Sequence, residues 1–137
     1  MNDQQQKRKE LASYRIKQAE ESLDEARFLL SGQKSPRSVM NRAYYAMFYS
    51  VLALLIHEPY SSSKHSGVLS YFNKHFVMGG IFDKDLGRAL NKAFELRLRE
   101  DYREFMPLTI EQVVPFIDKS SEIIEAIKEY LKKTDKI

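Results

Sequence analysis

Apolar residues recur at helical spacing in five stretches of the chain, and turn signals separate these stretches. The first stretch runs from about residue 5 to residue 30, and charged residues cover the side opposite its apolar stripe. The stripe alternates steps of three and four residues through Ile16, Ala19, Leu23, Ala26 and Leu30. This spacing predicts an amphipathic helix. Gly32 marks its end, because glycine suits the left-handed residue that follows many helices.

The second stretch, from about residue 36 to residue 57, is apolar around nearly its whole circumference. Ser35-Pro36 predicts its start, since serine is a good N-cap and proline is favoured at the first helical position. A helix that is apolar all round must be surrounded by protein, so we expect it to be central and to contribute to a dimer contact. One face holds only small residues, which allow another helix to come close: Ala43, Ala46, Ser50 and Ala53.

Three further helices are predicted over about residues 63–77, 84–105 and 109–131. Thr109 and Gln112 have the spacing of a capping box at the start of the last one. Pro115 predicts either a kink or a helix that begins later than Thr109, because proline inside a helix removes a backbone hydrogen bond. No stretch alternates like a strand flanked by turns. The chain is therefore expected to be all-α, an up-and-down helical bundle of four to five helices in a single domain, 1–137.

Charge and composition set limits on the function. The chain has 22 basic and 19 acidic residues and a net charge of +3, which permits an acidic partner without demanding one. It has no cysteine, and its three histidines lie far apart in sequence, so we expect no metal and no cofactor. The longest apolar run, residues 43–56, is shorter than the roughly 20 residues that span a bilayer. We therefore expect a cytoplasmic protein with no membrane contact.

Arg97 lies on the apolar stripe of the fourth predicted helix, together with Leu86, Leu90 and Ala93. An arginine in such a position needs a partner. One interpretation is that Arg97 pairs with Asp101, four residues on, and closes the end of the core. The other is that Arg97 lines a cleft and binds an anion such as an RNA phosphate, for which a planar guanidinium is suited.

Four other residues are candidate ligand contacts, and each has a structural alternative. His65 opens the stripe of the third helix, where it is either a core histidine or a general acid or base beside Arg97. Its neighbour Lys64 is either a ligand contact or a solvated residue of the first turn. Arg42 can bind a ligand or neighbouring carbonyl and carboxylate groups. Tyr45 can stack on a base or pack in the core.

Three segments together resemble small prokaryotic HEPN-domain proteins. They are Asn-Arg-Ala-Tyr-Tyr-Ala-Met-Phe-Tyr at 41–49, Ser-Lys-His-Ser-Gly-Val at 63–68, and Leu96-Arg97 followed by Asp101-Tyr102. The resemblance covers roughly residues 8–131. It implies a four- to five-helix bundle and a homodimer. It also implies a minimal nucleotidyltransferase as partner, with which many such proteins form a toxin–antitoxin pair.

The resemblance also bears on catalysis. Active HEPN relatives are metal-independent RNases that use an arginine and a later histidine with four to six residues between them. Arg97 matches that arginine, but Tyr102, Arg103 and Glu104 stand where the histidine would fall. Asp101 and Tyr102 look like the substitute found in the subgroup with the Arg-Ala-Tyr-Tyr segment. Three functions follow as alternatives: a partner module that binds nucleotide or RNA, a metal-independent endoribonuclease, and a purely structural helical dimer.

Overall fold

The computed structural model describes residues 2–102 and 107–137, and the side chains of these residues other than 99–102. In this part of the chain every regular element is helical, which confirms the all-α prediction. The elements in order are α1 (Asp3–Ser31), α2 (Pro36–Leu55), α3 (His65–Phe72), the π-helical turn η1 (Asn73–Val77), α4 (Lys84–Tyr102) and α5 (Ile110–Lys133).

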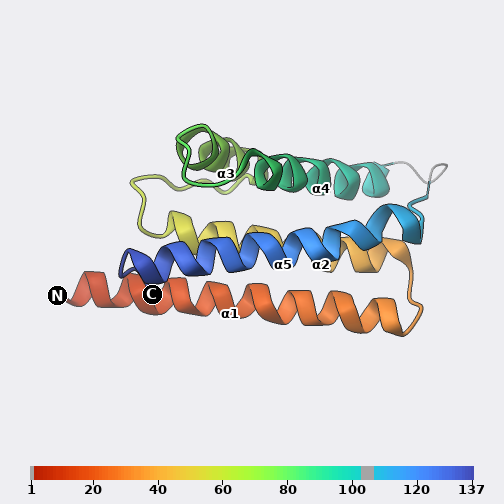
Figure 1. The fold of residues 1–137 in the computed structure, drawn as a ribbon, viewed down its shortest axis with the longest axis horizontal. Helices are drawn as coiled ribbons and strands as arrows, with labels where there is room; N and C mark the ends of the chain where they lie inside the picture. The colour runs from red at the N-terminus through yellow and green to blue at the C-terminus, as the bar shows by residue number, and fades with distance from the viewer. Residues whose placement is uncertain (1, 103–106) are drawn as a thin grey trace.

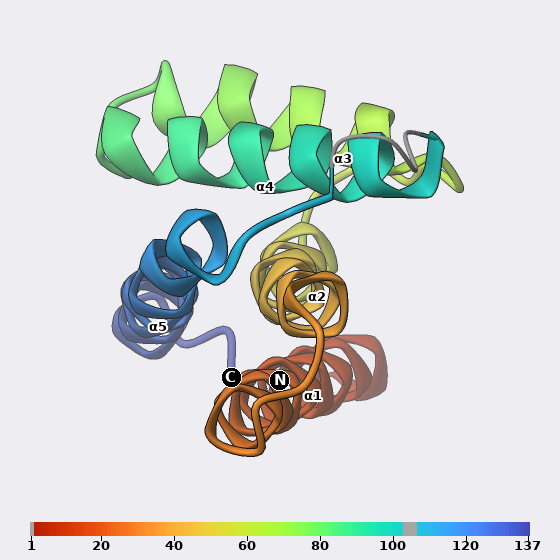
Figure 2. The same cartoon turned by 90° about the vertical axis from the view of Figure 1, so that its right-hand side faces the viewer.

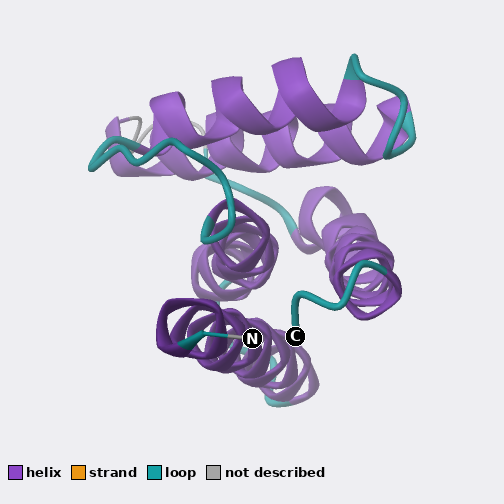
Figure 3. Cartoon of the chain, turned by 90° about the vertical axis from the view of Figure 1, so that its left-hand side faces the viewer, coloured by secondary structure: helices purple, strands orange, loops and turns teal. Residues whose placement is uncertain are grey.

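The long helices reverse direction in turn, from α1 to α2 and from α4 to α5 (Figure 1). Helices α1, α2 and α5 lie side by side along the long axis of the molecule. The hairpin of α3 and α4 crosses one side of this group. Figure 2 shows α1, α2 and α5 end-on, with the hairpin lying across them. The two chain termini lie at the same end, away from the loop between α1 and α2 (Figures 1 and 3).

The predicted starts of α2 and α5 are confirmed. Ser35 caps α2 by accepting a hydrogen bond from the Ser38 N–H, and Pro36 takes the first helical position. Thr109 and Gln112 cap each other reciprocally at the start of α5, through bonds of 2.9 and 3.2 Å. The alternative of a later start for this helix is therefore wrong, and α5 continues through Pro115 in its second turn.

The turn after α1 differs from the expectation in one residue. Gly32 has a φ of −81°, whereas the left-handed conformation falls on Gln33 with a φ of 56°. The N–H groups of Gly32, Gln33 and Lys34 bond back to carbonyls of the last helical turn. These bonds satisfy backbone acceptors that the end of a helix leaves free.

Helix α2 is central, as its apolar circumference predicts. It contacts α1, α3, α4 and α5, most extensively α1. Two buried serines on the neighbouring helices hold it in register: Ser22 donates to the Arg42 carbonyl at 2.7 Å, and Ser120 donates to the Ala43 carbonyl at 2.8 Å. The chain's own helices thus bury the circumference of α2, which therefore does not by itself require a second copy of the chain.

The third predicted helix is shorter than expected and ends in the π turn η1. The Met78 N–H bonds to the Asn73 carbonyl at 2.8 Å, five residues back. Gly87 of α4 packs on this turn, where a Cβ atom would lie 2.6 Å from Asn73 Oδ1 and 3.2 Å from a Val77 methyl group. The close approach of α4 to the turn therefore depends on a glycine at this position.

Candidate functional site

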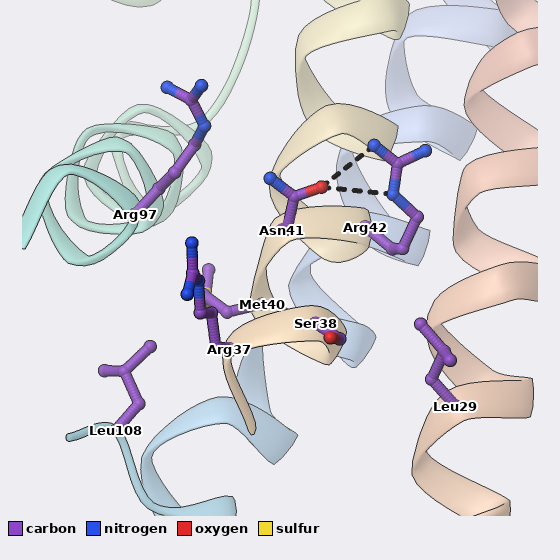
Figure 4. Close-up of a pocket in the computed structure, with 8 residues that line it drawn as sticks. All are labelled: Leu29, Arg37, Ser38, Met40, Asn41, Arg42, Arg97 and Leu108. Carbon is purple, nitrogen blue, oxygen red and sulfur yellow. Dashed lines mark hydrogen bonds between the residues drawn. The ribbon is translucent and has the colours of Figure 1, made fainter. Parts of the chain in front are cut away.

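A cavity of about 450 Å³ opens where the end of α1, the start of α2, the end of α4 and the start of α5 meet (Figure 4). We call it the cationic pocket, because its lining includes three arginines and, among the described residues, no acidic side chain. The full lining is Leu29, Arg37, Ser38, Met40, Asn41, Arg42, Arg97 and Leu108. Its volume falls within the range that small-molecule sites occupy.

Arg97 reaches the pocket from α4, one turn after Ala93 on the buried face of that helix. Its Nη2 donates a 3.2 Å hydrogen bond to the Tyr45 hydroxyl, and its guanidinium lies 5.5 Å from the centre of the Tyr44 ring. The Nε of Arg97 is buried and has no hydrogen-bond partner among the residues that the structure describes. A buried N–H without an acceptor costs stability, and it marks a place where a ligand oxygen can be bound.

Tyr45 holds two cations beside the same pocket. The Arg42 guanidinium lies 5.3 Å and the Arg97 guanidinium 5.2 Å from the centre of its ring. The negative faces of an aromatic ring attract cations, so the ring offsets part of the repulsion between the two arginines. Tyr45 is therefore better placed to support Arg42 and Arg97 than to stack on a base.

The start of α2 supplies the rest of the positive charge. Asn41 Oδ1 accepts two bonds from Arg42, at 2.9 Å from Nη2 and 3.2 Å from Nε (Figure 4). This partner is a neutral amide, so Arg42 keeps its full charge. Arg37 stands in the first turn of α2, where the helix dipole adds positive potential. The pocket thus has the electrostatics of an anion site.

His65 lies in an aromatic cluster beside this pocket. Its ring stacks on Phe48 with centroids 4.0 Å apart, and its Nδ1 shares a 2.8 Å hydrogen bond with the Tyr44 hydroxyl. Burial, and then the nearby charge of Arg97, lower the pKa of His65. Burial raises the pKa of the Tyr44 hydroxyl, with Arg97 opposing that rise. Both groups are therefore neutral near pH 7.

The structure brings some of the predicted site residues together and separates others. Arg97 and Arg42 line the cationic pocket, and Tyr45 contacts both of them. His65 is linked to this group through its hydrogen bond to Tyr44, whose ring faces Arg97. Lys64 is exposed at the start of α3 and does not line the pocket, which fits the solvated-residue interpretation. The side chains of Asp101 and Tyr102 lie outside the described residues, so an Arg97–Asp101 pair stays a prediction.

Sequence reasoning missed Arg37, which lines the pocket next to Arg97. A signal for it exists in the sequence. Arg37, Asn41 and Tyr45 follow one another at intervals of four residues, so they share one face of α2. That face points toward the end of α4 rather than toward α1.

Two properties of the described residues bear on other classes of protein. No group of three or more histidine, aspartate or glutamate side chains in this part of the chain is arranged to hold a metal ion. Within the same part, none of the helices has both the length and the apolar character needed to cross a membrane.

The helical bundle and its cationic pocket define a small all-α protein with a positively charged cavity at one end. Residues 12–130 match the family model of the HEPN domain, and the chain belongs to that family. A UPF0332 protein of Thermotoga maritima is 40% identical over 124 residues, which cover 90% of this chain and 93% of that protein. The chain is thus also homologous to the UPF0332 proteins.

Two archaeal relatives carry a functional name. A protein of Methanocaldococcus jannaschii named "Putative toxin MJ0605" is 36% identical over 118 residues, which cover 86% of this chain and 87% of that protein. A second one from the same organism, named "Putative toxin MJ0142", is 33% identical over 116 residues, or 85% of this chain and 78% of that protein.

Proposed function

We propose that this HEPN-domain protein is one half of a toxin–antitoxin pair and binds the phosphates of a nucleotide or RNA in the cationic pocket. It acts as a homodimer with a minimal nucleotidyltransferase as its partner, in the cytoplasm. The observation that carries the binding proposal is the lining of the pocket. Arg37, Arg42 and Arg97 face one cavity, and no described residue of its lining has a carboxylate to neutralise them.

The chemistry of arginine supports a phosphate ligand. A guanidinium keeps its charge at any physiological pH and offers paired donors that match phosphate oxygens. The unused Nε–H of Arg97 is one such donor, and the start of α2 adds the positive end of a helix dipole. The apolar wall of the pocket, formed by Leu29, Met40 and Leu108, suits the less polar part of a nucleotide.

Binding can be measured by fluorescence anisotropy with a labelled single-stranded RNA, and by competition with ADP. Replacing Arg97 with alanine removes one phosphate contact, and we expect affinity to fall about tenfold or more, which corresponds to roughly 1.4 kcal/mol. Arg88→Ala is the matched control, because Arg88 lies on the same helix, is exposed and pairs with Asp85 at 3.4 Å. Equal RNA affinity of Arg97→Ala and Arg88→Ala would contradict the proposal that RNA binds in the cationic pocket.

Two arguments support a nucleotidyltransferase as the partner. The two relatives in Methanocaldococcus jannaschii carry the name "Putative toxin". The segments around Arg42, His65 and Arg97 resemble those of HEPN proteins that act with a nucleotidyltransferase. Coexpression of this chain with a nucleotidyltransferase encoded beside it should give a stable complex on size exclusion. Failure of the two folded chains to associate would count against a pair. Sedimentation of the chain alone tests the homodimer, and a monomer at micromolar concentration would exclude it.

A second candidate function, metal-independent RNA cleavage, is favoured by the position of His65. The family histidine is missing after Arg97, but His65 stands close enough for Arg97 to lower its pKa. A neutral imidazole can accept the proton of a 2′-hydroxyl. When Nδ1 carries the ring proton and donates it to Tyr44, Nε2 is the free acceptor.

One set of variants distinguishes RNA cleavage from RNA binding. An RNase of this kind should cut RNA in the presence of a chelator, and His65→Gln should abolish cutting while RNA affinity stays within about twofold. Arg97→Ala should reduce both. No cleavage of a broad RNA panel by the folded protein would leave binding as the function. If Arg97→Ala keeps both RNA cleavage and RNA affinity and only lowers the stability of the protein, the structural dimer would be favoured.

A further inference from the structure

A second cavity, which shares no lining residue with the cationic pocket, lies at the other end of α2. Its volume is about 470 Å³. Residues from α1, the end of α2, the loop that follows and α3 line it, among them Arg15, Leu52, Leu55, Glu58, Ser61 and Val68. We call it the Arg15 pocket. The proposed binding of nucleotide or RNA does not use it.

Arg15 has donor groups that nothing in the described protein uses. Its Nη1 donates to Gln18 Oε1 at 2.7 Å, which leaves the edge formed by Nε and Nη2. The Nε is buried and has no hydrogen-bond partner in the described part of the chain. None of the ion pairs in the described part of the chain includes Arg15, although Glu58 lines the same cavity. The Nε–Nη2 edge can bind a carboxylate through two parallel hydrogen bonds.

The floor of the pocket is apolar. Leu55 and Val68 are buried and Leu52 is half-buried, so an aliphatic side chain of about four carbons would be enclosed on several sides. Glu58 faces the cavity with a carboxylate that already accepts a 3.0 Å bond from the Tyr71 hydroxyl. A further N–H donor near Glu58 would be favourable. The pocket thus presents an anion site, an apolar site and an acceptor.

From this arrangement we infer that the Arg15 pocket binds an α-carboxylate next to a branched aliphatic side chain. The carboxylate lies on the Nε–Nη2 edge of Arg15, the side chain lies on Leu52, Leu55 and Val68, and the nitrogen on the α-carbon faces Glu58. Two sources carry this chemistry. One is the C-terminal residue of a peptide, which presents an amide N–H, and the other is a free amino acid, which presents an ammonium group.

The test is a titration of the full ¹⁵N-labelled chain, followed by amide chemical shifts. N-acetyl-L-leucine represents a peptide C-terminus, L-leucine represents the free amino acid, and N-acetyl-L-leucine amide has the same shape without the carboxylate. We expect saturable shifts in residues 52–68 and around Arg15 with at least one of the two carboxylates. The amide should bind at least about tenfold more weakly. The ratio of N-acetyl-L-leucine to L-leucine affinity identifies the source.

Two variants and a control complete the experiment. Arg15→Gln should weaken the carboxylate probe about tenfold or more and leave the amide probe unchanged. Lys17→Gln removes a positive charge from an exposed site on the same helix, outside the pocket, and should leave both unchanged. If Arg15→Gln does not fold, Ser61→Trp obstructs the rim from an exposed loop position and should abolish the shifts. No shifts with either carboxylate, or equal affinity for the amide, would overturn the inference.

Discussion

Replacing Arg97 with methionine should cost little stability, because the guanidinium is only partly satisfied in the protein. Methionine keeps an unbranched apolar stem that adapts to its surroundings, so the change removes mainly the charged group. The free energy of unfolding then reports how much the charged group contributes. If Arg97 serves only to close the core, the substitution should lower the free energy of unfolding by a large amount. If the guanidinium is available to bind an anion, the decrease should be small.

The expected size follows from the contacts of Arg97. The hydrogen bond to Tyr45 involves a charged donor and stabilises by about 1.5–3 kcal/mol, and each ring contact adds about 0.5–1 kcal/mol. The buried Nε without a partner costs about 1–3 kcal/mol, which the substitution recovers. The net loss is therefore on the order of 1–2 kcal/mol.

Urea denaturation, followed by circular dichroism, measures this difference. Arg88→Met is the matched control and should change stability by less than about 0.5 kcal/mol, since Arg88 is exposed. A loss above about 4 kcal/mol for Arg97→Met would refute the reasoning. It would mean that Arg97 is fully paired, as in the predicted bond to Asp101, and that its charge is not available to a ligand.

The remaining predictions concern packing and pH. Gly87→Ala should destabilise the protein by about 1–3 kcal/mol, because the new Cβ would lie 2.6 Å from Asn73 Oδ1. Gly32→Ala, whose nearest contact would be an ordinary 3.4 Å, is its control in the same urea titration, and equal losses would contradict the packing argument. The lowered pKa values of His65 and His57 mean that the unfolded chain binds protons more readily, so stability should fall as pH drops below about 6.5 and level off below the folded pKa values. The variant His65→Gln should lose less stability than the wild type between about pH 7 and pH 5, and identical pH profiles would refute this assignment.

The sequence was sufficient to predict the helices because their boundaries are encoded locally. Ser35-Pro36 and the Thr109–Gln112 pair are short-range signals, and both cap helices as predicted. The π turn after Phe72 has no such signal. It accompanies the packing of Gly87 from a later helix on Asn73, which is a tertiary contact.

The candidate site was predictable only in part, for the same reason. Periodicity placed Arg97 on the inner face of its helix, and the structure confirms that position. Its contact with Tyr45 joins residues 52 apart in sequence, so only the packing of α4 on α2 reveals it. The fold leaves the Nε of Arg15 without a hydrogen-bond partner among the described residues, and no local sequence pattern indicates this.

The salt dependence of RNA binding tests the central claim most directly. The logarithm of the binding constant falls linearly with the logarithm of salt concentration, with a slope of about 0.7 for each single-strand phosphate that the protein neutralises. If the cationic pocket holds phosphates, Arg37→Met, Arg42→Met and Arg97→Met should each reduce the slope by roughly 0.7, while Arg88→Met leaves it unchanged. Slopes equal to the wild-type slope in all three pocket variants would contradict the account.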